Sequence, residues 1–151
     1  MKIEEAIKQK NPFRNEWHRT AVNLIFTTNW LVNQQKEVFK DFDITPQQYN
    51  VLRILRGQNG RPISTSDIRD RMLDKMSDVS RIVDRLVKKG LVNRHPCSAD
   101  KRLVDVLITP AGLEMLDSID HHNTGIDSFL HHLSEAEARQ LNDLLDKMRH
   151  D

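Results

Sequence analysis

Apolar residues recur every three or four positions over most of the chain, which is the spacing of one buried helical face. The apolar residues of this kind between positions 14 and 42 are Trp17, Ala21, Leu24, Ile25, Leu31, Val32, Val38, Phe39 and Phe42. They predict a long first helix with one buried face. Phe26 and Trp30 lie four apart outside that face, so they are expected either to pack within one subunit or to bury surface in a dimer.

Signals for the start and end of helices divide the middle of the chain. A Thr-Pro-Gln-Gln sequence beginning at Thr45 supplies an N-cap, a first-turn proline and a capping glutamine, and predicts a helix over 46–56. A capping-box spacing begins a second helix, predicted over 64–72. A third apolar period predicts a helix over 75–89, which ends at Gly90 because glycine readily adopts the left-handed conformation.

Two short β-branched runs, 91–95 and 103–108, flank a turn-like segment and predict a β-hairpin with a long loop. Three helices followed by a hairpin is the order of a winged helix-turn-helix, a mainly helical fold whose third helix enters the major groove of DNA. We therefore expect a winged-helix core over residues 45–109.

Two further apolar stripes follow the hairpin. The first predicts a fifth helix from Pro110 toward residue 133, although Gly125 argues against a straight helix there. The second follows a capping box at Ser134 and predicts a last helix. The 151 residues are expected to form one domain, in which segments 1–42 and 110–151 flank the winged-helix core.

Charge is distributed unevenly, although the net charge is only +1. Residues 1–60 carry +3, residues 61–102 carry +5, and residues 103–151 carry −7. A basic centre favours an anionic partner, and it coincides with the predicted winged-helix core. Chance fluctuation and an acidic protein partner are the alternatives to DNA.

The third predicted helix has polar and basic side chains opposite its apolar face. Hydroxyls and guanidiniums can reach phosphates and base edges, although an ordinary solvated face would have a similar composition. The expected DNA-binding residues here are Ser77, Ser80, Arg81, Arg85 and Lys88. Asp78 and Asp84 share this face. Because phosphate repels them, each should lie away from the DNA backbone, pair with an arginine, or accept from a cytosine amino group.

The hairpin loop ends in Asp100, Lys101 and Arg102. A long, permanently charged side chain on a protruding loop suits the narrow minor groove, where the negative potential is high. Lys101 and Arg102 are therefore expected DNA contacts. Asp100 is expected to support the wing, by holding the loop or orienting a basic side chain; simple solvent exposure is its alternative.

Residues 45–109 resemble the MarR family of winged-helix regulators. The resemblance rests on Thr45-Pro-Gln-Gln-Tyr-Asn-Val-Leu52, Val83-Asp-Arg-Leu-Val-Lys-Lys-Gly-Leu-Val-Asn-Arg94, the Asp-x-Arg wing and Leu107-Ile-Thr109, and it extends over roughly 14–150. It implies a transcription regulator of the repressor type, a homodimer joined through 1–42 and 110–151 that binds a pseudo-palindromic operator. It also implies a small phenolic or other effector, bound among the first helix, the helix from Pro46 and the start of the fifth helix.

Other candidate chemistry is weaker. Cys97 is the single cysteine, so the chain cannot form an intrachain disulfide, which suits a reducing, cytoplasmic compartment. Beside His95, Cys97 could form an oxidant-sensing thiolate. The histidine pairs at 121–122 and 131–132 would lie about 15 Å apart on one helix, too far for one metal ion. No enzyme motif, cofactor site, export signal or apolar membrane-spanning run is present in the sequence.

Overall fold

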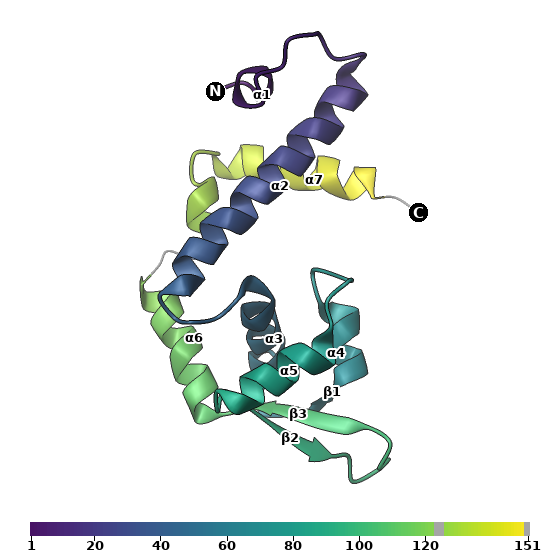
Figure 1. Ribbon diagram of the computed structural model, residues 1–151, viewed down its shortest axis with the longest axis vertical. Coiled ribbons are helices and arrows are strands. Elements are labelled where there is room, and N and C mark those ends of the chain that lie inside the picture. The colour runs from purple at the N-terminus through teal and green to yellow at the C-terminus, as the bar shows by residue number, and fades with distance from the viewer. Residues whose placement is uncertain (123–125, 150–151) are drawn as a thin grey trace.

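The computed structural model describes residues 1–122 and 126–149 and places a winged-helix core beneath long terminal helices (Figure 1). The elements are α1 (Ile3–Ala6), α2 (Glu16–Lys40), α3 (Pro46–Arg56), β1 (Ile63–Ser64), α4 (Thr65–Arg71), α5 (Val79–Lys88), β2 (Val92–Pro96), β3 (Val104–Ile108), α6 (Pro110–His122), the 3-10 helix η1 (Ile126–Leu130) and α7 (Glu135–Met148). This mainly helical architecture confirms the predicted fold.

The hydrophobic core surrounds α3. Val51, Leu52 and Leu55 of this helix are each at most 2% exposed. They belong to one cluster that runs in sequence from Phe39, at the end of α2, to Ile119 in α6. The predicted Thr45 capping box forms as expected: the side-chain oxygen of Thr45 accepts the Gln48 N–H at 3.1 Å, which satisfies a donor that the helix itself leaves free. Most of the buried apolar surface therefore lies in the winged-helix core.

The wing belongs to a three-stranded antiparallel sheet with the order β1-β3-β2. In the hairpin, Arg94 of β2 pairs with Val106 of β3, and the two strands lie within a residue of the predicted runs 91–95 and 103–108. Strand β1 was not predicted, because two residues are too few to show a period. At the turn before β2, Gly90 has φ +72°, the left-handed conformation expected of it. A Cβ on Gly112 would lie 2.4 Å from the Leu91 carbonyl oxygen, so only glycine lets α6 approach the sheet this closely.

The prediction of a helix over 75–89 was wrong at its start, because α5 begins only at Val79. Asp78 is the N-cap, and its side chain accepts the Arg81 N–H at 3.2 Å. The chain before it forms a turn, in which Asp74 Oδ1 accepts the Met76 N–H at 2.9 Å. Met76 is 91% exposed and is not part of the apolar face. The Asp side chains compete with helical hydrogen bonding here, so the turn replaces the first helical residues.

The fifth helix is also shorter than predicted, because α6 ends at His122 and η1 follows. Gly125 lies outside the described residues. In the described part of the chain, no group of three His, Cys, Asp or Glu side chains could hold a metal ion, and no helix is long and apolar enough to cross a membrane.

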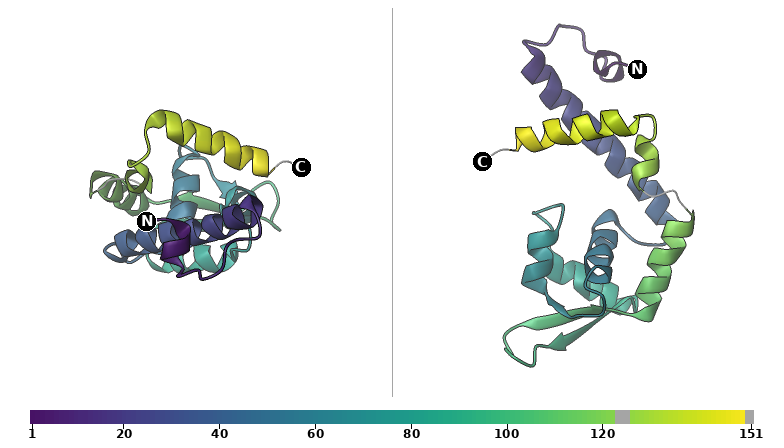
Figure 2. Two further views of the ribbon diagram at one scale, coloured as in Figure 1. Left: turned by 90° about the horizontal axis from the view of Figure 1, so that it is seen from above. Right: turned by 180° about the vertical axis from the view of Figure 1, so that it is seen from behind.

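The apolar face of the first helix is not buried as predicted. In α2 only Phe39 is buried, whereas Trp17 is 82% and Ile25 is 65% exposed. Helix α7 crosses α2 in Figure 1 and in the right-hand view of Figure 2, whereas the two helices lie apart when seen from above, and α7 has no buried residue of its own. Trp30 packs edge-on against Phe129, with ring centroids 6.5 Å apart, so it has a partner within the subunit. The core covers only the C-terminal end of α2, so apolar side chains nearer its start, such as Trp17 and Ile25, remain exposed.

Candidate nucleic-acid interface

Helix α5 separates its apolar and polar side chains onto opposite faces. Val79, Val83 and Leu86 are at most 1% exposed and anchor the helix in the core. The residues left on its outer face and exposed to solvent include Ser80, Arg81, Arg85 and Lys88. These are four of the five residues that the sequence assigned to the DNA-binding face. The three cations are free of ion pairs with the described residues, so their charge is available to an anionic partner.

Ser77 does not lie on the outer face of α5 as predicted. It precedes the N-cap, and its backbone N–H donates to the Asp74 carbonyl oxygen at 3.2 Å. The residue is half-buried, and its hydroxyl oxygen is buried without a hydrogen-bond partner among the described residues. The physical reason is the late start of α5, which puts Ser77 in the preceding turn.

The two acidic residues of α5 are occupied by structural contacts. Asp78 caps the helix, as described above. The carboxylate of Asp84 forms an ion pair with the guanidinium of Arg94 on β2. Pairing with an arginine was one of the three arrangements expected for these residues. The ion pair neutralises a charge that phosphate would repel, and it connects the wing to α5. The role of Arg94 was not recognised in the sequence, because the pairing depends on strand β2 lying beside α5.

The wing holds Arg102 through a close contact with Asp100. The backbone N–H of Arg102 donates to Asp100 Oδ1 at 3.0 Å, and its Nε and Nη2 donate to the two carboxylate oxygens at 3.1 Å each. These hydrogen bonds from the Arg102 side chain, and then from its backbone, hold the pKa of Asp100 below its usual value of 3.8. The Arg102 side chain itself is 89% exposed. Asp100 thus orients a guanidinium that faces solvent.

The remaining wing residues have simpler surroundings. Lys101 is exposed at the tip beside Arg102. Cys97 is a half-buried free thiol, and its backbone N–H donates to the Leu103 carbonyl oxygen at 3.0 Å. His95 is exposed on β2. The DNA contacts of Lys101 and Arg102, and oxidant sensing by Cys97, stay predictions.

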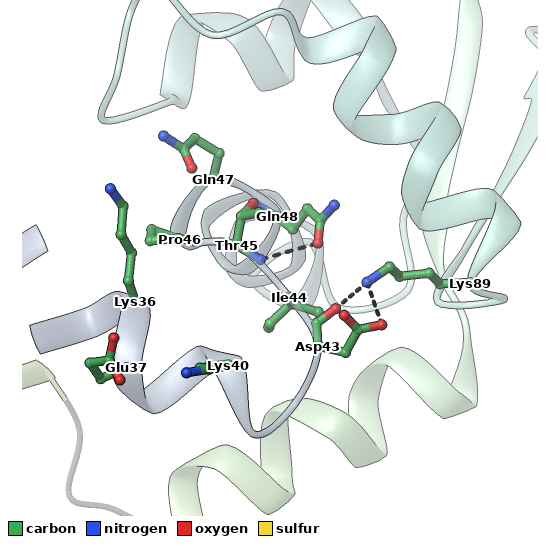
Figure 3. A pocket seen from close by; sticks show the side chains of 10 residues that line it. All are labelled: Lys36, Glu37, Lys40, Asp43, Ile44, Thr45, Pro46, Gln47, Gln48 and Lys89. Carbon is green, nitrogen blue, oxygen red and sulfur yellow. Dashed lines mark hydrogen bonds and ion pairs between the residues drawn. The ribbon is translucent and has the colours of Figure 1, made fainter. Parts of the chain in front are cut away.

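The far end of α5 is attached to the connection between α2 and α3. Figure 3 shows the Lys89 ammonium group contacting Asp43, whose carboxylate oxygen Oδ2 is 3.2 Å away and whose carbonyl oxygen accepts a second bond. This contact closes one side of a hollow of about 510 Å³, into which Lys36 and Lys40 extend from α2. Lys89 therefore positions the helix and is not free to bind DNA.

A second cavity of about 510 Å³ lies between the long helix and the winged-helix core. Leu31 and Gln35 of α2, Asn50 of α3, and Leu73 and Asp74 of the turn before α5 are among the residues that line it. Its walls combine apolar side chains with a few polar groups, which is typical of small-molecule sites. This cavity shares α2 and α3 with the location that the resemblance implies for an effector, but the turn before α5 lines it in place of the fifth helix. That an effector binds here stays a prediction.

An exposed basic helix after a helix and turn, next to a hairpin with an arginine at its tip, defines a winged helix-turn-helix DNA-binding protein. The MarR family model matches residues 42–103 of the chain. Over 116 residues the chain is 29% identical to the transcriptional repressor IacR of Pseudomonas putida, covering 76% of this chain and 68% of IacR.

Two solved structures have a similar fold. A cysteine-to-serine mutant of MarR from E. coli, solved in complex with operator DNA, has a TM-score of 0.78 and 26% identity over 93% of this chain and all of that chain. The organohalide-sensing regulator RdhR in its 2,4-dichlorophenol-bound form has a TM-score of 0.79 and 16% identity over 93% of this chain and 86% of that chain. The chain is therefore similar to the MarR family in its winged-helix segment, and it shares the fold of MarR over most of its length. It is a DNA-binding transcriptional regulator and not an enzyme, as the sequence predicted.

Proposed function

We propose that the protein is a repressor that binds a pseudo-palindromic operator as a homodimer and is released by a small-molecule effector. The observation that carries DNA binding is the outer face of α5, where Arg81, Arg85 and Lys88 are exposed while Asp84 is neutralised by Arg94. A basic surface whose acidic side chain is paired with an arginine can bind the phosphates of DNA. IacR, a relative with 29% identity, is named as a repressor, which supports repression.

The residues would divide the contact between the two grooves. Ser80, Arg81 and Arg85 would reach base edges and phosphates in the major groove, with Lys88 on the backbone and Ser77 at the edge of the contact. On the wing, Lys101 and Arg102 would enter or border the minor groove, and Asp100 would hold Arg102 in place.

Exposed apolar surface on the terminal helices supports a homodimer. On α2, Trp17 and Ile25 are largely exposed, and on α7 the exposed fractions are 40% for Leu141, 55% for Leu144 and 57% for Met148. Apolar surface of this extent is typical of an interface between subunits. A two-fold dimer would place two copies of α5 about one duplex turn apart, roughly 34 to 36 Å, and would read a two-fold operator.

The cavity between α2, α3 and the turn before α5 is the site we propose for the effector. Its volume of about 510 Å³ is sufficient for a small organic molecule. RdhR, which shares the fold, was solved with 2,4-dichlorophenol bound. An effector would release DNA by binding more tightly to a conformation in which the spacing of the two copies of α5 does not match the operator. A ligand with equal affinity for both conformations would leave their populations unchanged.

The test is fluorescence anisotropy of the purified protein titrated onto the promoter DNA beside its own gene, with unrelated DNA as the control, at several salt concentrations. We expect tight, sequence-preferring binding with a steep negative salt dependence, and a dimer by light scattering. No binding even at low salt would overturn the proposal and favour a winged helix that binds an acidic protein.

A further inference from the structure

Asn50 connects α3 to the turn that precedes the DNA-binding helix. Its side-chain oxygen accepts the backbone N–H of Leu73 at 2.9 Å, although the two residues are 23 positions apart in the sequence. Leu73 follows Met72, the C-cap of α4, whose side chain is 1% exposed. Leu73 therefore follows directly after a residue anchored in the core, and its backbone N–H is held by the Asn50 amide oxygen.

The turn held by Asn50 determines where α5 begins. Within it, Asp74 accepts N–H bonds from Met76 and Ser77, at 2.9 and 3.2 Å. Asp78 follows immediately and caps α5. These bonds make residues 73–78 a short unit, so a displacement at Leu73 is transmitted to the first turn of α5 and to Arg81.

The same part of the turn also lines the proposed effector cavity. Asn50, Leu73 and Asp74 all contribute to its wall. Leu73 is 87% exposed, so a bound apolar molecule would cover a side chain that water now surrounds. Asp74 is the only ionisable residue among the described residues that line the cavity. A carboxylate ligand would be repelled by Asp74 and find no cation in this wall.

We infer that the cavity binds an uncharged apolar molecule carrying a hydroxyl group, and that Asn50 couples this ligand to α5 by exchanging its bond to Leu73 for a bond to the ligand. This inference rests on the proposed effector site. It makes Asn50 a positioning residue: it acts on DNA binding through the turn and α5.

The chemistry of the amide suits this exchange. An asparagine side chain has an oxygen that accepts and an NH₂ group that donates two bonds. The oxygen accepts the Leu73 N–H, and the NH₂ group makes no hydrogen bond to the other described residues. The terminal torsion of asparagine is broad, so a ligand hydroxyl can turn the amide at small cost. Once the oxygen turns away, the Leu73 N–H loses its acceptor and residues 73–78 are released.

The experiment uses the full-length protein and a matched pair of probes, 2,4-dichlorobenzyl alcohol and 2,4-dichlorobenzoate, which differ mainly in charge. Calorimetry measures their binding, and hydrogen exchange measures the amides of residues 73–78 with and without the alcohol. The variant is Asn50→Ala, and the control is Gln35→Ala, which alters the same cavity without touching the turn. Thermal unfolding checks that both variants are folded.

For the wild-type protein we expect the alcohol to bind at least about tenfold more tightly than the benzoate, and its binding to speed exchange over 73–78. In Asn50→Ala, exchange should be fast without the alcohol and change little on adding it. Gln35→Ala should exchange slowly until the alcohol binds. If Asn50→Ala does not fold, Asn50→Asp retains an oxygen acceptor for Leu73 and should exchange slowly without ligand.

Three results would overturn the inference: no binding of the alcohol, equal or tighter binding of the benzoate, or wild-type exchange over 73–78 that the bound alcohol leaves unchanged or slows. Promoter binding is measured separately on the same samples. Exchange that responds to the alcohol in a protein that does not bind DNA would overturn the proposed function and leave the coupling through Asn50 in place.

Discussion

Replacing Arg102 by alanine should weaken DNA binding without destabilising the fold. The side chain is 89% exposed and contacts Asp100, also on the wing, so its removal leaves the hydrophobic core unchanged. If Arg102 neutralises one phosphate in each half-site, a dimer loses two contacts. Each contact contributes about 0.9 to the slope of log affinity against log salt concentration, so the slope should become less steep by about 1.8. At about 0.15 M salt this corresponds to roughly thirtyfold weaker binding.

The assay is an anisotropy titration of the promoter DNA at several salt concentrations, combined with thermal unfolding. Arg139→Ala is the matched control, because Arg139 is also exposed, at 74%, and also binds a carboxylate, that of Glu135, at 3.1 Å. Arg139 lies on α7, away from the wing. We expect this control to keep the wild-type affinity and slope. An unchanged slope for Arg102→Ala, an equal loss for Arg139→Ala, or a large fall in the melting temperature of Arg102→Ala would refute the reasoning.

Further predictions concern the core, the sheet and the wing. Leu86→Ala should lower the free energy of unfolding by about 2 to 5 kcal/mol, because the side chain is fully buried, and a loss below about 1 kcal/mol in urea denaturation would contradict this. Gly112→Ala should cost about 1 to 3 kcal/mol, because its Cβ would collide with the Leu91 carbonyl oxygen; an unchanged melting temperature would exclude this collision. Arg102 lowers the pKa of Asp100. The stabilising contact between the two side chains is therefore fully present above the ordinary Asp pKa of 3.8 and is lost as the pH falls through the lowered pKa. The ratio of DNA affinities of wild type and Asp100→Asn should therefore stay constant between about pH 5 and pH 8.

Local features of the chain were predicted well because they depend on neighbouring residues. The helix from Pro46 to Arg56 begins and ends as expected, since Thr45 and Gln48 cap it within four residues of each other. The hairpin also follows from a short-range pattern of β-branched residues and turn residues. The two errors at helix ends, at the start of α5 and at the end of α6, occur where the apolar spacing continues but other local signals oppose a helix. The Asp side chains before Val79 form a turn, although the apolar spacing continues through Met76.

The candidate interface was predicted in part, because helical periodicity indicates which side chains share a face. It placed Ser80, Arg81, Arg85 and Lys88 together, and all four are exposed on α5. It misplaced Ser77, because one turn of helix fewer at the start moves that residue off the face.

The sequence by itself determined the order of the helices and the hairpin, the basic face of α5 and the arginine at the wing tip, because periodicity, capping and charge act over a few residues. Only the tertiary structure decided that Asp84 meets Arg94 and that Asn50 holds Leu73, because these contacts join different elements. It also decided that part of the apolar face of α2, including Trp17 and Ile25, remains exposed. Periodicity shows that a helix has an apolar face, but only the arrangement of the other elements determines what covers it.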